Sequence, residues 1–436
     1  MKGTRQRNIA EISCALAASG RYRNLESCLY EFCPPCWTLR KPEFVESYLR
    51  PEIDNIFPGL ADYLSYRNLQ EIYRQLCGRL PMEKRSKLEN CNQKYLCCID
   101  GLYRISDGAI LPPDPGLDLF SYLNVRTSKI GRGNGYYTEL FLTNATNGDS
   151  ALRARLLEMV AVILTAMPLK RFFLLEGPGD TGKGQLIKFL RYLLGNSSCF
   201  NVSSINELSR PFTTSNLVDK LMCCCPDIPD ETLNAKVIGI IKQIVGDDTV
   251  HGEIKFGPSI DFDCYAKLVF ASNAPLKVPY HGGKEAFIRR MIHIPFHNSV
   301  PEDKQIPQLY QHLLNEAGYF IGLALEQRKK FIQRKCVFTE LPDLEWKTVQ
   351  PPDDEQRIVT FIQSCCELTP NATTPVTNLY DAFSEYDMFF GTHPIERSQF
   401  SRLLQQGPFQ LQGGRKSTYR YICGIRLKEQ FQPAEP

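Results

Sequence analysis

The residues most able to do chemistry form a glycine-rich run, Gly177-Pro178-Gly179-Asp180-Thr181-Gly182-Lys183-Gly184. An apolar segment, residues 172–175, precedes the run, and a helical pattern, residues 185–194, follows it. Glycines in such a loop let backbone N–H groups turn inward around phosphate oxygens, and the N-terminus of the next helix favours negative charge. A lysine at the end of the loop can reach the outer phosphates. The run therefore predicts a nucleotide-binding loop between a strand and a helix.

The loop has the Gly-x4-Gly-Lys spacing of a Walker A motif, but the residue after Lys183 departs from that motif. Gly184 stands where a serine or threonine hydroxyl normally holds Mg²⁺, and Thr181 does not obviously replace it. The loop therefore predicts the groups that bind the phosphates more clearly than it predicts the ligands of the metal. We expect ATP to be bound by Gly177, Gly179, Asp180, Thr181, Gly182, Lys183 and Gly184.

A second candidate group follows the apolar segment 220–225. A carboxylate at the C-terminal edge of a strand suits a Walker B motif, in which it binds the metal while a neighbouring acid orients the attacking water. We assign Asp227 to Mg²⁺ and Asp230 to the water, with Glu231 as a weaker candidate for the second role. The alternative is a helix N-terminus, because acidic residues before the helical pattern 233–245 would also complement the helix dipole.

Two further polar groups follow in order along the chain. Asn273 ends the apolar segment 267–272, and an amide there can hydrogen-bond both the γ-phosphate and the attacking water. Taken alone, Ser-Asn before Ala-Pro is also a turn signal. Arg289 and Arg290 precede another apolar segment, where guanidinium groups can stabilise charge on a phosphate in a neighbouring subunit. Either arginine alone could equally be a solvated strand edge.

Lys183, Asp227, Asn273 and the arginine pair lie in this order within residues 177–290. The set resembles superfamily 3 helicases, the ring ATPases of viruses, phages and mobile elements. It is similar in particular to the helicase half of the poxvirus- and phage-type primase–helicases. The phrases that carry the resemblance lie in residues 227–230, 243–255, 270–275 and 289–296. Residues 98–112 look like the N-terminal hairpin of that family, and residues 379–386, 400–404 and 424–425 resemble its winged helix, whereas residues 1–90 match loosely.

The resemblance implies a homo-oligomeric ring, a hexamer, that binds ATP and Mg²⁺ between neighbouring subunits. Lys183 and Asp227 would act within one subunit, and Arg289 or Arg290 would act on its neighbour. A hairpin between the Walker B segment and Asn273 would enter the central channel. His251 and Lys255, near a turn at residues 257–258, are the candidates to contact single-stranded DNA there, since a cation can hold backbone phosphates without reading sequence. Lys255 could equally be a solvated hairpin charge.

The chain departs from that family in three respects. Asp180 and Thr181 stand where an asparagine usually precedes Gly-Lys, and Gly184 replaces the hydroxyl residue, although glycine there looks familiar among phage members. The sequence also leaves no room upstream for a primase domain, and the metal-binding carboxylate cluster of such a domain is missing. We therefore expect a helicase without its own primase, and a separate primase is a candidate partner.

The elements that must position these residues suggest three domains. We expect a helical and hairpin N-terminal region over 1–150, an α/β AAA+-type P-loop ATPase core over 151–345, and a winged helix over 356–436. The N-terminal region would serve oligomerisation or associate with the helicase core. The sequence predicts helices over 9–18, 60–80, 150–166 and 304–334, a hairpin over 94–110 turning at Asp100-Gly101, and an aromatic strand over 136–142.

The last part of the chain indicates a DNA partner independently of the resemblance. Residues 397–428 hold seven Lys or Arg and no Asp or Glu, whereas the whole chain has a formal charge of only +3. We expect three helices and then a strand pair, 409–411 and 419–422, turning at Gly413-Gly414. In that order residues 398–405 would form the recognition helix, and Arg415 and Lys416 would lie at the wing tip near double-stranded DNA phosphates. A basic surface patch without a ligand is the alternative.

Composition narrows the class of protein. Apolar residues at 43% and charged residues at 23% are globular values, and a charge of +3 excludes an obvious polycationic nucleic-acid coat. No apolar run has the length of a membrane span, and no signal peptide is readable, so we expect no membrane partner and a cytoplasmic place in a bacterial host. Most of the 17 cysteines fit buried packing. Zinc or redox roles for Cys28, Cys33 and Cys36 are weaker alternatives.

Two functions remain in competition. The first is an ATP-dependent, ring-forming DNA helicase and replication initiator of a phage, plasmid or integrated element, with an origin recognised by the winged helix. The second is an ATP-binding regulatory or structural ring on DNA, nearly inactive because Gly184 weakens Mg²⁺ placement. A small-molecule kinase is disfavoured, because it would need neither the paired arginines nor the basic C-terminal segment.

Overall fold

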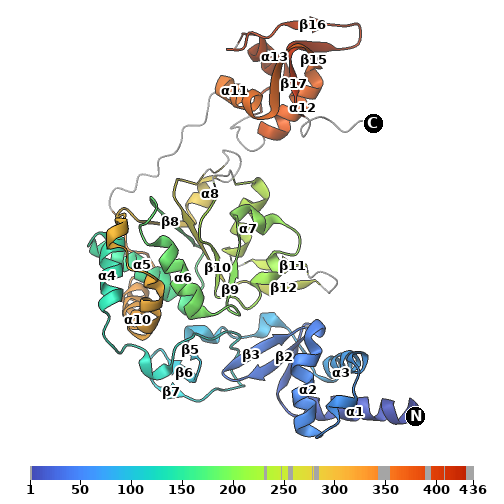
Figure 1. The fold of residues 1–436 in the computed structure, drawn as a ribbon, viewed down its shortest axis with the longest axis vertical. Helices are drawn as coiled ribbons and strands as arrows, with labels where there is room; N and C mark the ends of the chain where they lie inside the picture. Colours follow the sequence, from blue (N-terminus) through green and yellow to red (C-terminus); the bar gives the residue numbers. More distant parts are fainter. Residues whose placement is uncertain are drawn as a thin grey trace. The chain divides into compact units, whose positions relative to one another are not determined.

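The structure, a computed structural model, describes residues 2–229, 233–246, 248–253, 259–276, 278, 284–341, 354–387, 394–406 and 408–428. Its internal contacts divide the chain into two units. The first holds residues 1–229, 240–274 and 291–341, and the second holds residues 230–239, 275–290 and 342–436. Each unit is described by itself (Figure 1). Among the described residues, none of the helices combines the length and apolar character that crossing a membrane requires.

The N-terminal region contains a four-stranded sheet that the sequence did not predict. Its strand order is β3-β2-β1-β4, and three helices accompany it. The elements are α1 (Lys2–Ala18), β1 (Tyr22–Leu25), β2 (Cys28–Cys33), β3 (Cys36–Arg40), α2 (Val45–Ile56), α3 (Tyr66–Arg79) and β4 (Met82–Glu83). Leu16, Leu49 and Ile72 are fully buried and belong to one apolar cluster that joins the three helices. The glutamate of the middle strand, Glu31, is also buried and is neutralised by two arginines.

The predicted hairpin over 94–110 is confirmed as β5 (Tyr95–Cys98) and β6 (Gly101–Arg104), with β7 (Ile110–Leu111) as a third strand. Gly101 is needed at the turn, because its φ is +150° and a Cβ there would lie 2.5 Å from the Leu111 carbonyl oxygen. A buried hydrogen-bonded group joins this part of the chain to Asp219, which lies just before residues 222–225 of a parallel sheet. Arg85 donates to Asp219 at 2.9 Å, and Tyr30 donates to the other oxygen of that carboxylate at 2.5 Å.

The aromatic strand predicted over 136–142 is wrong, because these residues begin helix α4 (Tyr136–Thr146). The backbone N–H groups of Tyr137 and Thr138 donate to the two carboxylate oxygens of Glu316, at 3.1 and 2.7 Å. This side chain satisfies donors that an α-helix leaves unpaired at its N-terminus. The helix then buries Phe141, Leu142 and Ala145 at helical spacing.

A five-stranded parallel sheet forms the centre of the first unit. Its order is β14-β8-β13-β10-β9, and every neighbouring pair is parallel. The strands are β8 (Phe172–Glu176), β9 (Cys199–Asn201), β10 (Met222–Cys225), β13 (Lys267–Ser272) and β14 (Met291–Pro295). The helices of this unit include α5 (Ser150–Leu164), α6 (Lys183–Leu194), α9 (Leu309–Asn315) and α10 (Ala317–Gln333). Helix α7 (Ala235–Ile244) is divided between the two units, and α8 (Lys284–Ile288) belongs to the second unit. Residues of α5, α6 and α10 share one buried apolar cluster with the sheet, and α5 packs against α10 (Figure 1).

A two-stranded hairpin, β11 (Thr249–Gly252) and β12 (Ile260–Asp263), lies in the chain between β10 and β13. It is antiparallel, and His251 pairs in register with Asp261. The connection at residues 254–258, which holds the candidate DNA contact Lys255, lies outside the described residues. The candidate acids Asp230 and Glu231 lie outside them as well.

The described part of the second unit between residues 354 and 428 has a three-stranded antiparallel sheet of order β15-β17-β16. The elements are α11 (Asp354–Cys365), β15 (Cys366–Pro375), α12 (Val376–Asp387), α13 (Arg397–Gln406), β16 (Gly413–Arg415) and β17 (Arg420–Leu427). Phe361, Phe383 and Phe400 from the three helices contact one another, with the last two stacked at 4.6 Å. Strand β15 was not predicted, and the predicted turn at Gly413-Gly414 is wrong, because those glycines lie within β16.

Candidate phosphate-binding site

The glycine-rich run connects the end of β8 to the start of α6. Two of its glycines are required by the backbone. Gly177 has a φ of +155° and approaches Phe296 so closely that a Cβ would lie 1.8 Å from the Phe296 carbonyl oxygen. Gly182, which caps α6, has a φ of +94°. Between these two glycines, Asp180 also has a left-handed backbone conformation, with a φ of +59°. The predicted strand, loop and helix therefore occur where the sequence placed them.

The loop is held from two sides by backbone and side-chain hydrogen bonds. Gly177 N donates to Ser272 O at the end of β13, at 3.2 Å. On the other side, the segment after β14 supplies two donors. Ser299 Oγ donates to Gly179 O at 2.9 Å, and Val300 N donates to Asp180 O at 2.9 Å. These contacts fix the course of the loop independently of its own glycines.

The amine of Lys183 lies inside the loop. It donates to the carbonyl oxygens of Gly177 and Pro178 at 2.6 and 2.7 Å and to Thr181 Oγ1 at 3.2 Å. Lys183 is 6% exposed, so burial lowers its pKa below the ordinary value, whereas the charges of nearby carboxylates, above all Asp227, act in the opposite direction. The lysine is therefore a desolvated cation held at the N-terminus of α6.

The position that normally carries a metal-binding hydroxyl, Gly184, differs in its surroundings from Thr181, which has a hydroxyl. Gly184 is exposed at the start of α6, and a Cβ there would meet nothing within 4 Å. The Thr181 hydroxyl is buried, donates to Pro178 O at 3.1 Å and accepts from Lys183. It is therefore already engaged within the loop. Thr181 consequently does not take the place of the missing hydroxyl.

Asp227 and Asn273 lie side by side at the carboxyl edge of the sheet. Asp227 follows β10, Asn273 follows β13, and these two strands are parallel neighbours. Asn273 Nδ2 donates to Asp227 Oδ1 at 3.3 Å, and both residues are exposed. Backbone pairing continues beyond the strands, since Ile228 N donates to Ala271 O at 2.9 Å. The structure thus brings Lys183, Asp227 and Asn273 to the same edge of the sheet.

Sequence reasoning missed a carboxylate–imidazole pair at this edge. Glu176 is the last residue of β8, immediately before Gly177, and His293 lies on the neighbouring strand β14. Their Oε2 and Nε2 atoms are 3.3 Å apart, and both side chains are largely buried. Glu176 also contributes to the electrostatic surroundings of Lys183. The available signal was the position of a glutamate at the end of an otherwise apolar strand, directly before the glycine run.

The remaining candidates are placed as follows. Arg289 and Arg290 belong to the second unit, directly before β14, and Arg290 Nη1 donates to Ala286 O at 2.9 Å. His251 on β11 is exposed, and its Nδ1 lies 2.7 Å from Asp261 Oδ1.

The predicted wing tip carries a group of exposed cations. Arg415 ends β16 and pairs in register with Arg420 on β17, while Lys416 lies in the connection between them. The Lys416 amine lies 5.7 and 5.9 Å from the ring centres of Tyr419 and Tyr421. Like charges directly opposite each other destabilise a strand pair. An anionic partner would relieve that repulsion.

The three N-terminal cysteines lie on one hairpin. Cys28 and Cys33 are the ends of β2, and Cys36 begins β3, opposite Cys33 in register. Burial raises the pKa of both Cys28 and Cys33, which disfavours the thiolate that a metal or a redox reaction needs. Within the described ranges, no group of three or more His, Cys, Asp and Glu side chains is arranged to hold a metal ion.

Comparison with known proteins finds similarity over the phosphate loop and the strands that follow it. A family model described as a family of unknown function, DUF5906, matches residues 175–290, which include Lys183, Asp227, Asn273 and both arginines. No curated protein matches the chain. The match covers less than half of the chain, so it shows that residues 175–290 are similar to this family.

Two solved structures are similar over nearly the whole chain at low identity. The A form apo structure of the NrS-1 C-terminal region has 15% identity and a TM-score of 0.49, covering 95% of this chain and 98% of that one. An apo structure of the NrS-1 C-terminal region, residues 305–718, has 14% identity with the same score and coverage. These values assign neither fold nor activity. The chain is thus similar, over the segment that holds its candidate site, to a family whose own function is unknown.

Proposed function

We propose that this chain binds and hydrolyses ATP through an AAA+-type P-loop core and uses the energy to move along DNA as a superfamily 3 type ring helicase. The observation that carries the proposal is the arrangement of Lys183, Asp227 and Asn273 at one edge of a parallel sheet. The strand order adds support, because the loop strand β8 lies beside β13, whose end carries Asn273, and β13 lies beside β10. Open α/β sheets bind ligands at the carboxyl ends of their strands.

The residues at this edge have complementary chemistry toward a nucleoside triphosphate. The start of α6 offers unpaired backbone N–H groups and the positive end of the helix dipole to the phosphates. Lys183 exchanges the neutral carbonyl oxygens that it now contacts for phosphate oxygens, which accept stronger, charge-assisted hydrogen bonds. Asn273 holds Asp227 in place and has an amide oxygen with which to orient water.

The donor set around Asp227 fits Mg²⁺, which commonly takes one or two protein carboxylates and fills its remaining positions with phosphate oxygens and water. Asp227 is exposed and receives one hydrogen bond, so its carboxylate has further acceptor capacity. Bound there, Mg²⁺ would neutralise charge on the outer phosphates. Glu176 and His293 offer an acid–base pair beside the loop, which is a further candidate, besides Asp230, to position a water.

The DNA part of the proposal rests on the C-terminal segment. Its three helices and three-stranded sheet agree with a winged helix in the order of helices and terminal strands, and its wing carries Arg415, Lys416 and Arg420. Helix α13 would then be the recognition helix for double-stranded DNA. His251 and Lys255 would face single-stranded DNA in the channel of a hexamer, with Arg289 or Arg290 acting across the subunit interface. Such a ring would initiate replication of a mobile element in a bacterial cytoplasm, with priming by a separate protein.

The test is ATP hydrolysis with Mg²⁺, measured with and without single-stranded DNA for the wild type and Lys183→Ala. Lys188→Ala is the matched control, because Lys188 lies on the same helix but is exposed, with its amine over the ring of Tyr310 at 4.0 Å. We expect DNA-stimulated turnover that is lost in Lys183→Ala and retained in Lys188→Ala. Absence of both nucleotide binding and turnover in the wild type would contradict the proposal.

A second candidate function, an ATP-binding regulatory ring with little turnover, is favoured by one observation. Gly184 offers no hydroxyl, and the hydroxyl of Thr181 is engaged within the loop. Binding of ATP and DNA without hydrolysis by the wild type would favour this second function.

A further inference from the structure

A cavity of about 370 Å³ lies at the opposite edge of the parallel sheet from the phosphate loop. Its lining includes Arg171 just before β8, Asp219 before β10 and Lys267 at the start of β13. The glycine run follows the other end of β8, and a five-residue strand spans about 16 Å at roughly 3.3 Å per residue. The cavity is therefore separate from the candidate ATP site.

The opposite wall of the cavity is rich in side-chain amides. It is formed by residues 85–93 of the N-terminal region, including Asn90, Asn92 and Gln93. Asn92 is only 4% exposed, and it lines the cavity. Asn90 Nδ2 donates to Ala166 O at 3.1 Å, while its buried Oδ1 has no partner among the described residues. Buried amides without partners are costly, and a ligand that supplies the missing partners would remove that cost.

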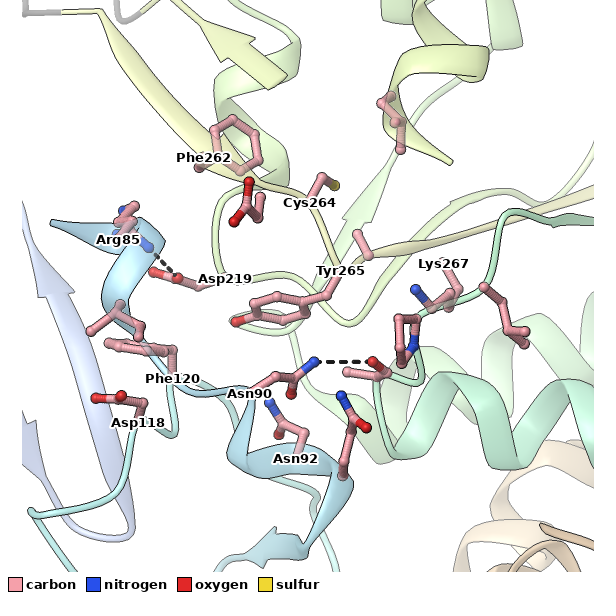
Figure 2. A pocket seen from close by; sticks show the side chains of 18 of the residues that line it. Arg85, Asn90, Asn92, Asp118, Phe120, Asp219, Phe262, Cys264, Tyr265 and Lys267 are labelled. Carbon is pink, nitrogen blue, oxygen red and sulfur yellow. Dashed lines mark hydrogen bonds and ion pairs between the residues drawn. The ribbon is translucent and has the colours of Figure 1, made fainter. Parts of the chain in front are cut away.

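Aromatic rings complete this wall. In the view of Figure 2 the ring of Tyr265 is drawn above Asn90 and Asn92, and Phe120 also lines the cavity. Burial raises the pKa of Tyr265 far above its usual value, so its phenol is neutral. Leu169, Ile244 and Val245 also line the cavity. The cavity therefore combines flat apolar faces with hydrogen-bonding amide edges.

The charges in the lining disfavour a phosphate, because the described part of the lining holds five carboxylates against three cations; they are Glu89, Asp118, Asp219, Asp248 and Asp263, and Arg85, Arg171 and Lys267. Arg85 forms an ion pair with Asp219, with its Nη1 atom 2.9 Å from Asp219 Oδ1, and its guanidinium lies over the rings of Tyr30 and Phe120. Asp248 and Asp263 are exposed, and neither makes an ion pair with a residue in the described ranges. A ligand with N–H donors satisfies these carboxylates, whereas an anion is repelled by them.

We propose that this cavity binds a nucleobase that carries an exocyclic amine, either as a free nucleoside or as an unstacked base of a single strand. The heterocycle stacks on Tyr265 and Phe120, its hydrogen-bonding edge pairs with the Asn92 amide, and its amine donates to Asp248 or Asp263. Amides pair with the adjacent donor and acceptor of adenine, and carboxylates accept from the amine of cytosine. Thymine and uracil present a carbonyl oxygen where the carboxylates need a donor, so they bind more weakly.

Adenosine is the probe, because it carries the base without any phosphate for the loop. Calorimetric titration of the full chain is expected to give saturable adenosine binding that is at least about tenfold tighter than thymidine binding, as the base contacts predict. Asn92→Leu, which keeps the branching at Cγ but removes the amide, is expected to weaken adenosine binding at least about tenfold. Gln333→Ala is the matched control, since Gln333 is an exposed amide at the end of α10. Because Lys183 is placed to contact phosphates, Lys183→Ala is expected to leave adenosine binding unchanged wherever adenosine binds; the loss of binding in Asn92→Leu is what separates this test from the proposed ATPase function.

Three results would overturn the proposal: no adenosine binding, equal binding of thymidine, or unchanged binding in a folded Asn92→Leu variant. Should that variant fail to fold, Asp248→Asn and Asp263→Asn decide the matter, because both residues are exposed and the double change is expected to reduce the preference for adenosine. An unaltered preference in the double variant would also overturn it.

The source of the base is identified by competition. A single-stranded oligo-dA added to adenosine-loaded Lys183→Ala protein displaces adenosine if the cavity takes a base from a strand, and leaves it bound if the cavity takes the free nucleoside. Either result supports the cavity as a nucleobase site. An abasic strand of equal length is the control, and displacement by that strand would contradict recognition of the base.

Discussion

The substitution Gly184→Ser separates the two candidate functions. A Cβ at Gly184 would meet nothing within 4 Å, so serine fits without moving a neighbour. Gly184 lies in the first turn of α6, where replacing glycine by serine removes about 0.5 kcal/mol of unfavourable helix propensity and replacing it by alanine removes about 1 kcal/mol. Both variants are therefore expected to fold and to melt slightly above the wild type.

The effect on hydrolysis depends on whether the missing hydroxyl limits the metal. If Asp227, phosphate oxygens and water hold Mg²⁺ adequately, as the proposed motor requires, the added hydroxyl changes kcat by less than about threefold, or ~0.6 kcal/mol of barrier. If poor metal placement keeps turnover low, one restored ligand is expected to raise activity by about 10- to 100-fold, the range over which supporting groups tune metal sites.

The assay is steady-state ATP hydrolysis across a Mg²⁺ titration with saturating single-stranded DNA, for wild type, Gly184→Ser and Gly184→Ala. We expect similar kcat values for all three. A rise of about tenfold or more in the serine variant alone would refute our reasoning about the metal and favour the regulatory ring. A rise in kcat in both the serine and the alanine variants would instead be explained by the higher stability of helix α6.

Further predictions concern the loop, the lysine, the thiols and the wing. Gly177→Ala forces a Cβ to within 1.8 Å of a backbone oxygen at a φ of +155°, so we expect its free energy of unfolding in urea to fall by about 2–4 kcal/mol. In Gly179→Ala the new Cβ meets nothing within 4 Å, so its free energy of unfolding should fall by less than about 1 kcal/mol. Burial lowers the pKa of Lys183, so nucleotide affinity should be full near neutral pH and should fall as the pH rises through this lowered pKa. Lys183→Arg should move the fall in affinity to higher pH. An unchanged pH profile in that variant would contradict the assignment of Lys183 to the phosphates. Iodoacetamide followed by mass spectrometry should label exposed Cys14 and spare Cys224, whose pKa burial raises to about 12, so early labelling of Cys224 would show that the sheet is open. The double change Arg415→Ala and Lys416→Ala should weaken duplex DNA binding for all sequences and reduce its salt dependence, while Arg426→Ala, whose guanidinium pairs with Glu367, should not; equal losses would count against the wing.

The candidate site was predictable because its signals are local. A glycine run between an apolar segment and a helical pattern places Lys183 without further information, and polar residues after apolar segments locate Asp227 and Asn273 at strand ends. Parallel strands bring those ends to one edge, which the Asp227–Asn273 hydrogen bond reflects. The Glu176–His293 pair was harder to foresee, because it depends on β14 lying next to β8, and sequence order does not specify which strands are neighbours.

The errors in the predicted elements have physical causes at long range. The segment 136–142 is rich in aromatic residues that suit a strand, but Glu316 caps its backbone N–H groups from a position far along the chain. The N-terminal strands carry charged residues such as Glu31, whose burial is tolerated only because Arg21 and Arg40 neutralise it. Strand β15 is polar and includes proline, so alternation gave no signal, and its pairing with β17 decides its conformation.

The contact of Arg85 and Tyr30 with Asp219 has a consequence for how this chain can be divided. Asp219 lies at the entry to β10, and both of its partners come from the first hundred residues. A fragment that begins near residue 150 would lose both partners of this carboxylate, so the contacts of Arg85 and Tyr30 with Asp219 would no longer contribute to its stability. The N-terminal region is therefore not an interchangeable module. In domain shuffling, truncation or recombination between related genes, the N-terminal region must be kept together with the segment that contains Asp219.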